Sequence, residues 1–300
     1  MKRLFLTALA PLIVSATPVP AAVQAPSGSG RAAWLAACAD TDDWDAPGPP
    51  FRIHGTSWYV GTCGISAILV TGPRGHVLID TGTAKGAEIV AANIRRAGFR
   101  LKDVKLLLHS HEHYDHVGGM ARMQQLTGAR LLASAEAAPV LASGRDSPGD
   151  PQAGLSPPFA PAKVYRRLTH GEVVRLGPIA LTAHVTPGHT PGALSWSWQS
   201  CTRPGRDCKA IVFVDSLSPI SSDSYRFSHH PAYVAAFREG LRHLAALPCD
   251  ILIAPHPGAN DLYGRIAEQT LSAPGQCIDY ASRITTRLDA RLAKEALPAP

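Results

Sequence analysis

A dense run of histidine and carboxylate side chains follows an apolar segment in the first half of the chain. The apolar residues 104–108 predict a buried strand, and a His-x-His-x-Asp-His run comes shortly after it. The run supplies these metal-competent side chains: His111, His113, Asp115 and His116. Imidazole nitrogen and carboxylate oxygen are the ligands that zinc takes where thiolates are absent. Because a tight loop can point side chains in two directions, the run can serve two adjacent metal ions.

Two further histidines stand at the ends of predicted strands. His189 lies in a Thr-Pro-Gly-His-Thr-Pro-Gly turn at residues 186–192, and His256 lies in a Pro-His-Pro-Gly turn at 255–258. Proline and glycine fix sharp turns, which orient an imidazole ring. A histidine flanked in this way could merely cap a turn. Three such strand ends in one chain instead favour one shared metal centre.

The N-terminus has the pattern of a secretory signal peptide. Lys2 and Arg3 precede an apolar stretch at residues 4–14, and small residues follow through Ala25. The apolar stretch is too short to span a bilayer as a stable helix. We therefore expect residues 1–25 to be a signal peptide whose cleavage site the sequence leaves open. Residues 26–300 should form one domain that is periplasmic or secreted, with no membrane attachment after signal removal.

Charge and hydrophobic patterning restrict the partners. The formal net charge is +6, and the basic residues are scattered rather than gathered in a stripe with interleaved aromatics. Nucleic acid is therefore a poor partner. The mild positive charge favours a small anionic substrate only weakly. We expect a monomer, because the sequence has no apolar stripe beyond what a core needs.

Six cysteines in an exported chain predict disulfides. Cys201 and Cys208 flank a polar stretch at residues 202–207 that is typical of a hairpin loop, so this pair is predicted first. The other four would pair by sequence order: Cys38 with Cys63, and Cys249 with Cys277. Thiolate ligation of a metal is the alternative, and no Cys-x-x-Cys spacing supports it.

Strands and helices are predicted in two successive, similar batches. The first batch has strands at 58–60, 66–70, 76–80, 104–108 and 130–134, with helices at 85–97 and 117–126. The second has strands at 173–176, 179–186, 194–198, 210–214 and 251–254, with helices at 231–247, 264–271 and 279–297. The proline-rich segment 143–161 is interpreted as a long irregular loop, either a functional lid or a mobile surface excursion. This order predicts an α/β fold, a four-layer αββα sandwich.

These motifs together resemble the metallo-β-lactamase superfamily. The resemblance is carried by the His-x-His-x-Asp-His run and by the two histidine turns. The Gly-Thr-Cys-Gly-Ile-Ser stretch at 61–66, Asp-Ser-Leu-Ser at 215–218 and Ser-Tyr-Arg-Phe-Ser at 224–228 are similar to the third subclass, B3, of the class B β-lactamases. The resemblance extends from about residue 34 to residue 280. It implies the metallo-β-lactamase fold with two Zn²⁺ ions as cofactors.

Matched position by position, the resemblance implies two sets of zinc ligands. The first set is His111, His113 and His189; the second is Asp115, His116 and His256. Three protein ligands and an open position are usual in catalytic zinc sites. Serine stands at position 216, where the other subclasses usually place a cysteine ligand, so a histidine would complete the second set instead.

The resemblance also implies a function. A zinc-bound hydroxide would hydrolyse the amide bond of β-lactam antibiotics (penicillins, cephalosporins and carbapenems) and so confer antibiotic resistance. Asp115 would be catalytic, because its carboxylate would accept a hydrogen bond from the hydroxide. Ser216 and Ser218 would bind the substrate carboxylate. The chain has no Ser-x-x-Lys motif, which is typical of the serine β-lactamases.

Two aspartates at strand ends have open roles. Asp215 is interpreted as a group behind the metal ligands. If it bridged the two metals instead, the alternative function would be a lactonase or a thioester hydrolase on the same dizinc fold. Asp80 either orients a ligand histidine through its other ring nitrogen or is a helix N-terminal carboxylate. A non-catalytic binding protein would lack a ligand, whereas all six positions are filled.

The other histidines lack motif support. We interpret His109 as structural, and we assign the rest to surface or packing roles: His54, His76, His170, His184, His229, His230 and His243.

Overall fold

Two β-sheets form the centre of the molecule. The computed structural model describes residues 29–297, so the predicted signal peptide at 1–25 lies outside the described residues. The seven-stranded sheet has its strands in chain order: β1 (Phe51–His54), β2 (Ser57–Tyr59), β3 (Ile68–Val70), β4 (His76–Ile79), β5 (Val104–Leu108), β6 (Arg130–Ser134) and β7 (Val164–Leu168). The five-stranded sheet has the order β12 (Ile251–Ile253), β11 (Arg206–Phe213), β10 (Leu194–Arg203), β9 (Ile179–Val185) and β8 (Val173–Leu176).

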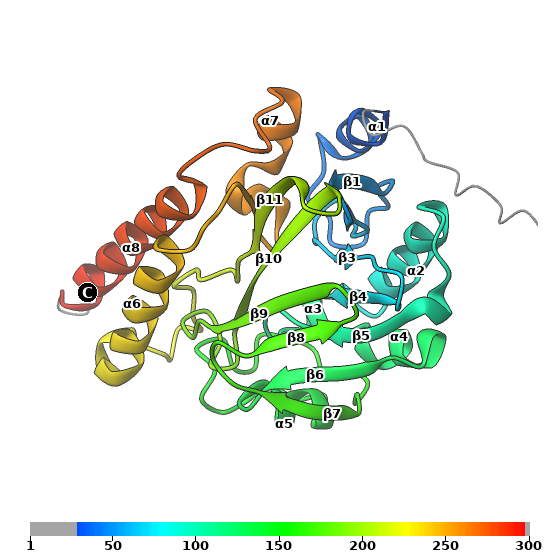
Figure 1. Cartoon of the computed structure of the whole chain (residues 1–300). Helices are drawn as coiled ribbons and strands as arrows, with labels where there is room; N and C mark the ends of the chain where they lie inside the picture. The colour runs from blue at the N-terminus through cyan, green and yellow to red at the C-terminus, as the bar shows by residue number, and fades with distance from the viewer. Residues whose placement is uncertain (1–28, 298–300) are drawn as a thin grey trace, which may run out of the picture.

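Helices cover the outer faces of both sheets. The seven-stranded sheet packs against α2 (Gly86–Arg96), α4 (Met120–Thr127) and α5 (Ala137–Ser143). The five-stranded sheet packs against α6 (Pro231–Ala245) and α8 (Gln276–Glu295). Figure 1 shows α6 and α8 on one side of the sheets and α2 and α4 on the other. This arrangement confirms the predicted αββα sandwich.

Alternating side chains in the strands divide the apolar core into three parts. Ile68 and Ile79 belong to the core between the two sheets, whereas their neighbours Leu69 and Leu78 belong to the core under the helices. Successive residues of a strand point to opposite faces of the sheet, so an apolar strand can bury both faces. The five-stranded sheet and its helices form the third part around Phe237.

Parallel strands bring the sites of interest to one edge. β4, β5, β6 and β7 are parallel neighbours, and β11 and β12 are parallel in the other sheet. The carboxyl ends of parallel strands meet at the same edge, where α/β folds commonly bind ligands. The segments after β4, β5, β11 and β12 carry Asp80, the His-x-His-x-Asp-His run, Asp215 and His256.

Several elements differ from the sequence-based expectation. α1 (Ser29–Cys38), β1, α5 and β7 were not predicted. β7 is exposed along most of its length, which removes the apolar alternation that marks a strand. The helix predicted at 117–126 is two helices, α3 (Tyr114–Val117) and α4, separated by Gly118 and Gly119. The helix predicted at 264–271 begins earlier, as α7 (Leu262–Ala267). Three short 3₁₀ helices complete the fold: η1 (Leu101–Asp103), η2 (Phe227–His229) and η3 (Pro257–Asn260).

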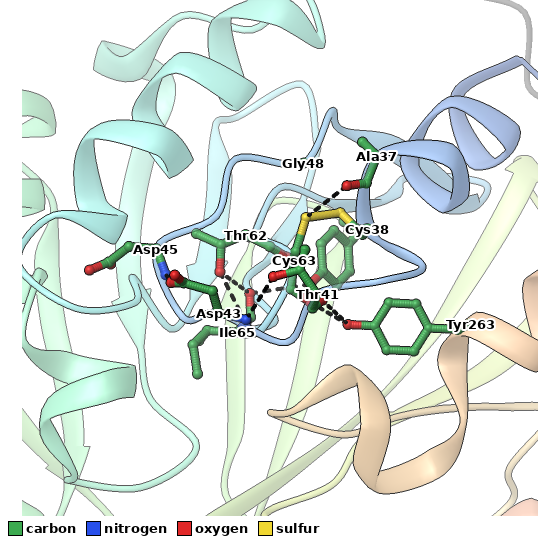
Figure 2. The surroundings of a disulfide bond; sticks show 12 residues. Ala37, Cys38, Thr41, Asp43, Asp45, Gly48, Thr62, Cys63, Ile65 and Tyr263 are labelled. Carbon is green, nitrogen blue, oxygen red and sulfur yellow. Dashed lines mark hydrogen bonds between the residues drawn. A yellow bond between two sulfur atoms is a disulfide. The ribbon is translucent and has the colours of Figure 1, made fainter.

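The six cysteines form three disulfides with the expected partners: Cys38–Cys63, Cys201–Cys208 and Cys249–Cys277. Figure 2 shows that Cys38–Cys63 joins the end of α1 to the segment after β2. The Tyr263 hydroxyl of α7 donates a hydrogen bond to the Cys63 carbonyl at 2.7 Å. Cys63 thereby links α1 to α7. Among residues 29–297, no helix combines the length and apolar character that a membrane crossing needs.

Candidate metal centre

The predicted ligands come from three loops, one after β5 of the seven-stranded sheet and two after β9 and β12 of the five-stranded sheet. The loop after β5 leads into α3, with His113 at the helix N-cap and Asp115 and His116 in its single turn. Gly118 and Gly119 end this turn in a tight space. A Cβ at Gly118 would lie 2.5 Å from the Tyr114 carbonyl oxygen, and one at Gly119 would lie 2.6 Å from the Ala87 Cβ. The two glycines therefore allow the loop to turn sharply toward α4.

The first expected ligand set lies together. His111, His113 and His189 each offer a ring nitrogen, and these atoms all lie within 4.8 Å of one another. The ring centroids are 5.0 Å apart for His111 and His113, 4.7 Å for His111 and His189, and 4.9 Å for His113 and His189. The His111 Nε2 atom is buried and has no hydrogen-bond partner among residues 29–297. A buried nitrogen without a partner is costly, and a metal ion would satisfy it.

The second expected set also converges. The Asp115 Oδ2 atom lies 3.0 Å from His116 Nε2 and 3.2 Å from His256 Nε2. The two imidazole nitrogens are 3.3 Å apart. His111, Asp115 and His116 form a second group whose ligand atoms lie within 4.8 Å of one another. His256 is the most open member, because its side chain is 33% exposed.

Each of four histidines has an oxygen close to its outer ring nitrogen. Asp215 Oδ1 lies 2.9 Å from His111 Nδ1, and Asp80 Oδ2 lies 3.4 Å from His116 Nδ1. The Ser218 carbonyl and hydroxyl oxygens both lie 3.0 Å from His189 Nδ1. A partner on the outer ring nitrogen fixes the orientation of a metal-binding histidine and leaves the other nitrogen for the metal. The contacts of this kind point His111 Nε2, His116 Nε2 and His189 Nε2 toward the centre.

Asp150 supplies the fourth such contact and was not predicted. Its Oδ2 atom lies 3.0 Å from His113 Nε2, and the aspartate side chain is 2% exposed. Asp150 comes from the irregular segment 143–161, where its Oδ1 atom accepts a hydrogen bond from the Gln152 amide at 2.7 Å. No local pattern in that segment marks the residue as part of a site.

Glu112 is a second unpredicted residue. It lies between two ligand histidines but points away from them, toward the loop that carries His189. The Thr190 hydroxyl donates to Oε2 at 2.7 Å, and the Gly192 amide donates to Oε1 at 2.8 Å. Burial raises the pKa of this carboxyl to about 7, although Thr190 opposes the shift. Glu112 thus joins two of the three loops that supply the centre.

Asp80 and Asp215 both lie outside the ring of candidate ligands. Asp80 directly follows β4 and has a positive φ of 61°. It accepts hydrogen bonds from the Ser110 amide at 2.7 Å and the Ser110 hydroxyl at 2.6 Å. The other Asp215 oxygen, Oδ2, accepts from the Leu217 amide at 3.0 Å. Asp215 therefore places its carboxyl behind His111.

The charges of the site favour a cation. Burial lowers the pKa of His111 and of His189 well below the ordinary value, so both imidazoles are neutral. Burial also opposes charge on His116, but Asp115 and Asp80 outweigh it and raise the pKa of His116 to about 10. The two carboxylates thus attract one positive charge to a buried place. Neutral imidazoles and a carboxylate around such a place fit a divalent metal ion.

The two serines expected at the substrate side differ in surroundings. The Ser216 hydroxyl is buried and has no hydrogen-bond partner in the part of the chain that the structure describes. The half-buried Ser218 hydroxyl contacts His189, as described above. His109 is also fully buried, and its Nε2 atom accepts from the Ser134 amide at 3.1 Å.

Comparison with known proteins places this centre in a family. Residues 60–202 match the family model of the metallo-beta-lactamase superfamily. The solved structure of the MIM-2 metallo-beta-lactamase is 53% identical, with a TM-score of 0.86 over 90% of this chain and 100% of that chain. MIM-1 from Novosphingobium pentaromativorans is 47% identical, with a TM-score of 0.85 over 88% of this chain and 98% of that chain.

Two other relatives are named for different activities. MEM-A1, a subclass B3 metallo-beta-lactamase isolated from a soil metagenome library, is 44% identical, with a TM-score of 0.81 over 85% of this chain and 99% of that chain. A hydroxyacylglutathione hydrolase of Bradyrhizobium sp. (strain ORS 278) is 29% identical over 49% of this chain. The chain spans about half the length of that curated relative, 48%.

The likeness to MIM-2, MIM-1 and MEM-A1 covers most of this chain and nearly all of each solved structure. The chain is therefore a hydrolase of the metallo-β-lactamase superfamily, and it belongs with the subclass B3 metallo-β-lactamases.

Proposed function

We propose that this protein is a zinc-dependent β-lactamase that hydrolyses the amide bond of penicillins, cephalosporins and carbapenems. The observation that carries the proposal is the placement of Asp215. Its carboxyl lies behind His111 rather than between the two ligand groups. The six remaining candidate ligands then form two sets without a bridging aspartate. This is the arrangement expected for the lactamase function, and it agrees with the similarity to named metallo-β-lactamases.

Two Zn²⁺ ions are the proposed cofactors. His111, His113 and His189 would hold one ion, and Asp115, His116 and His256 would hold the other. The unpartnered His111 Nε2 atom and the neutral state of His111 and His189 fit the first ion. When bound, a pair of zinc ions lowers the pKa of water toward about 7 and polarises a carbonyl group.

Asp115 is the proposed catalytic residue. Its carboxyl is held well below its usual pKa: burial acts in the opposite direction, but His116 and His256 outweigh it. The carboxylate is therefore an acceptor at neutral pH. We assign to it the orientation of the attacking water, through a hydrogen bond that points the oxygen lone pair at the lactam carbonyl. Direct attack of water needs no acyl-enzyme.

Residues at the rim would position the substrate. The Ser216 hydroxyl lacks a partner and is free to bond a carboxylate that enters the site. The Ser218 hydroxyl is half-buried beside His189 and is the second candidate for that contact. Trp44 is 47% exposed and lies 6.2 Å from His256, ring centre to ring centre. An exposed aromatic side chain at this place would cover the apolar part of a substrate.

A thioester hydrolase is the alternative function. Its support is the similarity to hydroxyacylglutathione hydrolases, which is lower and covers about half of the chain. A bridging aspartate would favour it, and the contacts of Asp215 do not support that role.

The site of action is proposed to be outside the cytoplasm. Residues 1–25 have a signal-peptide pattern, and the three disulfides suit an oxidising compartment. We propose that residues 26–300 act there as a single monomeric domain, on antibiotics that would otherwise reach the cell wall machinery.

The function is tested by the turnover of four substrates: a carbapenem, a cephalosporin, a homoserine lactone and a glutathione thioester. The proposal predicts hydrolysis of the β-lactams, loss of activity with a chelator and recovery with Zn²⁺. The variant His189→Ala, which removes one candidate ligand, should lose bound metal and activity together. Turnover of the lactone or the thioester but of neither β-lactam would instead establish the alternative. β-Lactam turnover that persists after complete metal removal would exclude the zinc proposal.

A further inference from the structure

Three histidines outside the candidate metal centre lie together on the outer side of the five-stranded sheet. His184 is in β9, His243 is in α6, and His170 is in the turn between β7 and β8. The neighbours of His184 in the strand show which way it points. Ala183 belongs to the core between the sheets, so His184 faces the opposite side, which α6 covers.

The spacing of these rings resembles that of the candidate metal centre. His184 Nδ1 and His243 Nε2 are 2.8 Å apart, with 4.9 Å between the ring centroids. The His170 ring lies 4.8 Å from that of His243 and 6.1 Å from that of His184. The rings of the first ligand set in the metal centre are 4.7 to 5.0 Å apart. Two of the three separations in the outer cluster therefore match those within the first candidate ligand set.

The buried member of the cluster is already oriented. His184 is 5% exposed, and its Nε2 atom lies 2.8 Å from the Ser197 hydroxyl of β10. This contact leaves Nδ1 facing His243. Burial, followed by the nearby His243 and His170, lowers the pKa of His184 to about 4. The ring is therefore neutral at pH 7, which is the state that binds a metal.

The other two members can adjust. His243 is half-buried at the last turn of α6, and His170 is exposed. The His170 Nδ1 atom accepts a hydrogen bond from the Val185 amide at 3.2 Å. Rotation of this exposed ring would bring a nitrogen toward the other two, and water can then bond to the Val185 amide. The adjustment is confined to one surface side chain.

We propose that His170, His184 and His243 form a separate surface site for a borderline divalent cation such as Zn²⁺, with water as the fourth ligand. Imidazole is the ligand type that suits zinc, copper and nickel, and three histidines with an open position are a known zinc arrangement. The site is independent of the proposed β-lactamase function, because within residues 29–297 no hydrogen bond or ring contact joins these three histidines to a candidate ligand of that centre. A hydrogen-bonded His184–His243 pair without metal affinity is the competing explanation.

Equilibrium dialysis against micromolar Zn²⁺ at pH 7.5, followed by metal analysis, tests the site. His243→Gln is the test variant. His229→Gln is its matched control, because His229 is exposed and lies outside the cluster. The wild type and the control should bind one more ion per chain than His243→Gln, and all three should hydrolyse substrate equally. Equal metal content in His243→Gln and the wild type would overturn the proposal.

A second variant tests the third ligand and does not depend on α6. His170→Gln changes an exposed residue of a turn, so folding should be unaffected. It should weaken binding of the extra ion about tenfold or more. In a crystal soaked with Zn²⁺, an anomalous peak should lie among the three rings of the wild type. Loss of the ion in His243→Gln with full affinity in His170→Gln would overturn the three-histidine site.

Discussion

Asp150 Oδ2 lies 3.0 Å from His113 Nε2, and both side chains are almost fully buried. The contact ties the irregular segment 143–161 to the metal centre. The same segment is held a second time, because the Ser222 amide donates to the Pro151 carbonyl at 2.8 Å. Of the two interpretations of this segment, a surface excursion does not describe the part around Asp150. That part is anchored and takes part in orienting a candidate ligand.

We therefore expect Asp150→Asn to weaken metal binding. The substitution keeps the shape of the side chain but removes the negative charge behind His113. Changes of this kind cost about 10- to 100-fold in metal affinity. Competition with a chromophoric chelator measures the effect, and turnover should recover at high Zn²⁺. Asp146→Asn is the control, because Asp146 lies in the same segment and bonds only to the Gly154 amide. Equal affinity in the two variants would contradict the assigned role.

The candidate ligands and the residues that orient them differ in how far the sequence could predict them. The His-x-His-x-Asp-His run and the two histidine turns are local patterns, so the candidate ligands could be named from them. The residues that orient the ligands and their loops act through contacts between distant parts of the sequence. Asp150 is 37 positions from His113, and Glu112 is 78 positions from Thr190. Only the fold brings these residues together. The same reason explains the histidine cluster around His184, whose members were interpreted as surface or packing residues.

Secondary structure was predictable where burial imposes a pattern. The apolar strands β3 to β6 and the amphipathic helices α2, α6 and α8 were expected close to their observed bounds. β7 was missed because Tyr165 and its neighbours are exposed. α5 was missed because Pro139 stands in its first turn, where proline is tolerated although it breaks most helices. In both cases packing against β6 overrides a weak local signal.

Glu112 should be structurally essential through its shape and hydrogen bonds. Glu112→Ala would leave the Gly192 amide and the Thr190 hydroxyl buried without partners, at a cost of about 2–4 kcal/mol in the free energy of unfolding. Glu112→Gln should cost less than half as much, because the amide can accept from Gly192 and donate to Thr190. Urea unfolding of both variants measures the difference. Equal losses would show that the charge, rather than the hydrogen bonds, holds the loops together.

The disulfides should differ in their contribution to stability. Cys38–Cys63 closes a sequence separation of 25 residues, and Cys201–Cys208 closes one of 7. In the chain-entropy description the first stabilises by about 3.5 kcal/mol and the second by about 2.4 kcal/mol. Paired Cys→Ala variants, unfolded in urea without a reductant, test the order. A larger loss on removing Cys201–Cys208 would be contrary to this expectation.

Glu295 should make stability depend on pH. It accepts hydrogen bonds from the Ser228 amide at 2.7 Å and the Phe227 amide at 3.1 Å, and it pairs with Arg291. Burial would raise its pKa, but these partners outweigh burial and lower the pKa below 4.5. A carboxyl with a lowered pKa stabilises the fold above its unfolded pKa, and this contribution is lost as the pH falls through the folded pKa.

Glu295→Gln should therefore lower the free energy of unfolding of the metal-free protein by about 1–2 kcal/mol at pH 7. The difference from the wild type should shrink as the pH falls below about 4.5. Urea unfolding at a series of pH values measures it, with the exposed Glu268→Gln as control. A difference that stays constant down to the acid end of the series would exclude the assigned cause.

The most direct test of the account is an anomalous-scattering map, at the zinc absorption edge, of a crystal grown with Zn²⁺. We predict one peak among His111, His113 and His189 and a second among Asp115, His116 and His256. Asp215 should remain behind His111 and touch neither peak. A map without peaks at these six side chains, or one in which Asp215 bridges two ions, would contradict the proposed zinc β-lactamase centre.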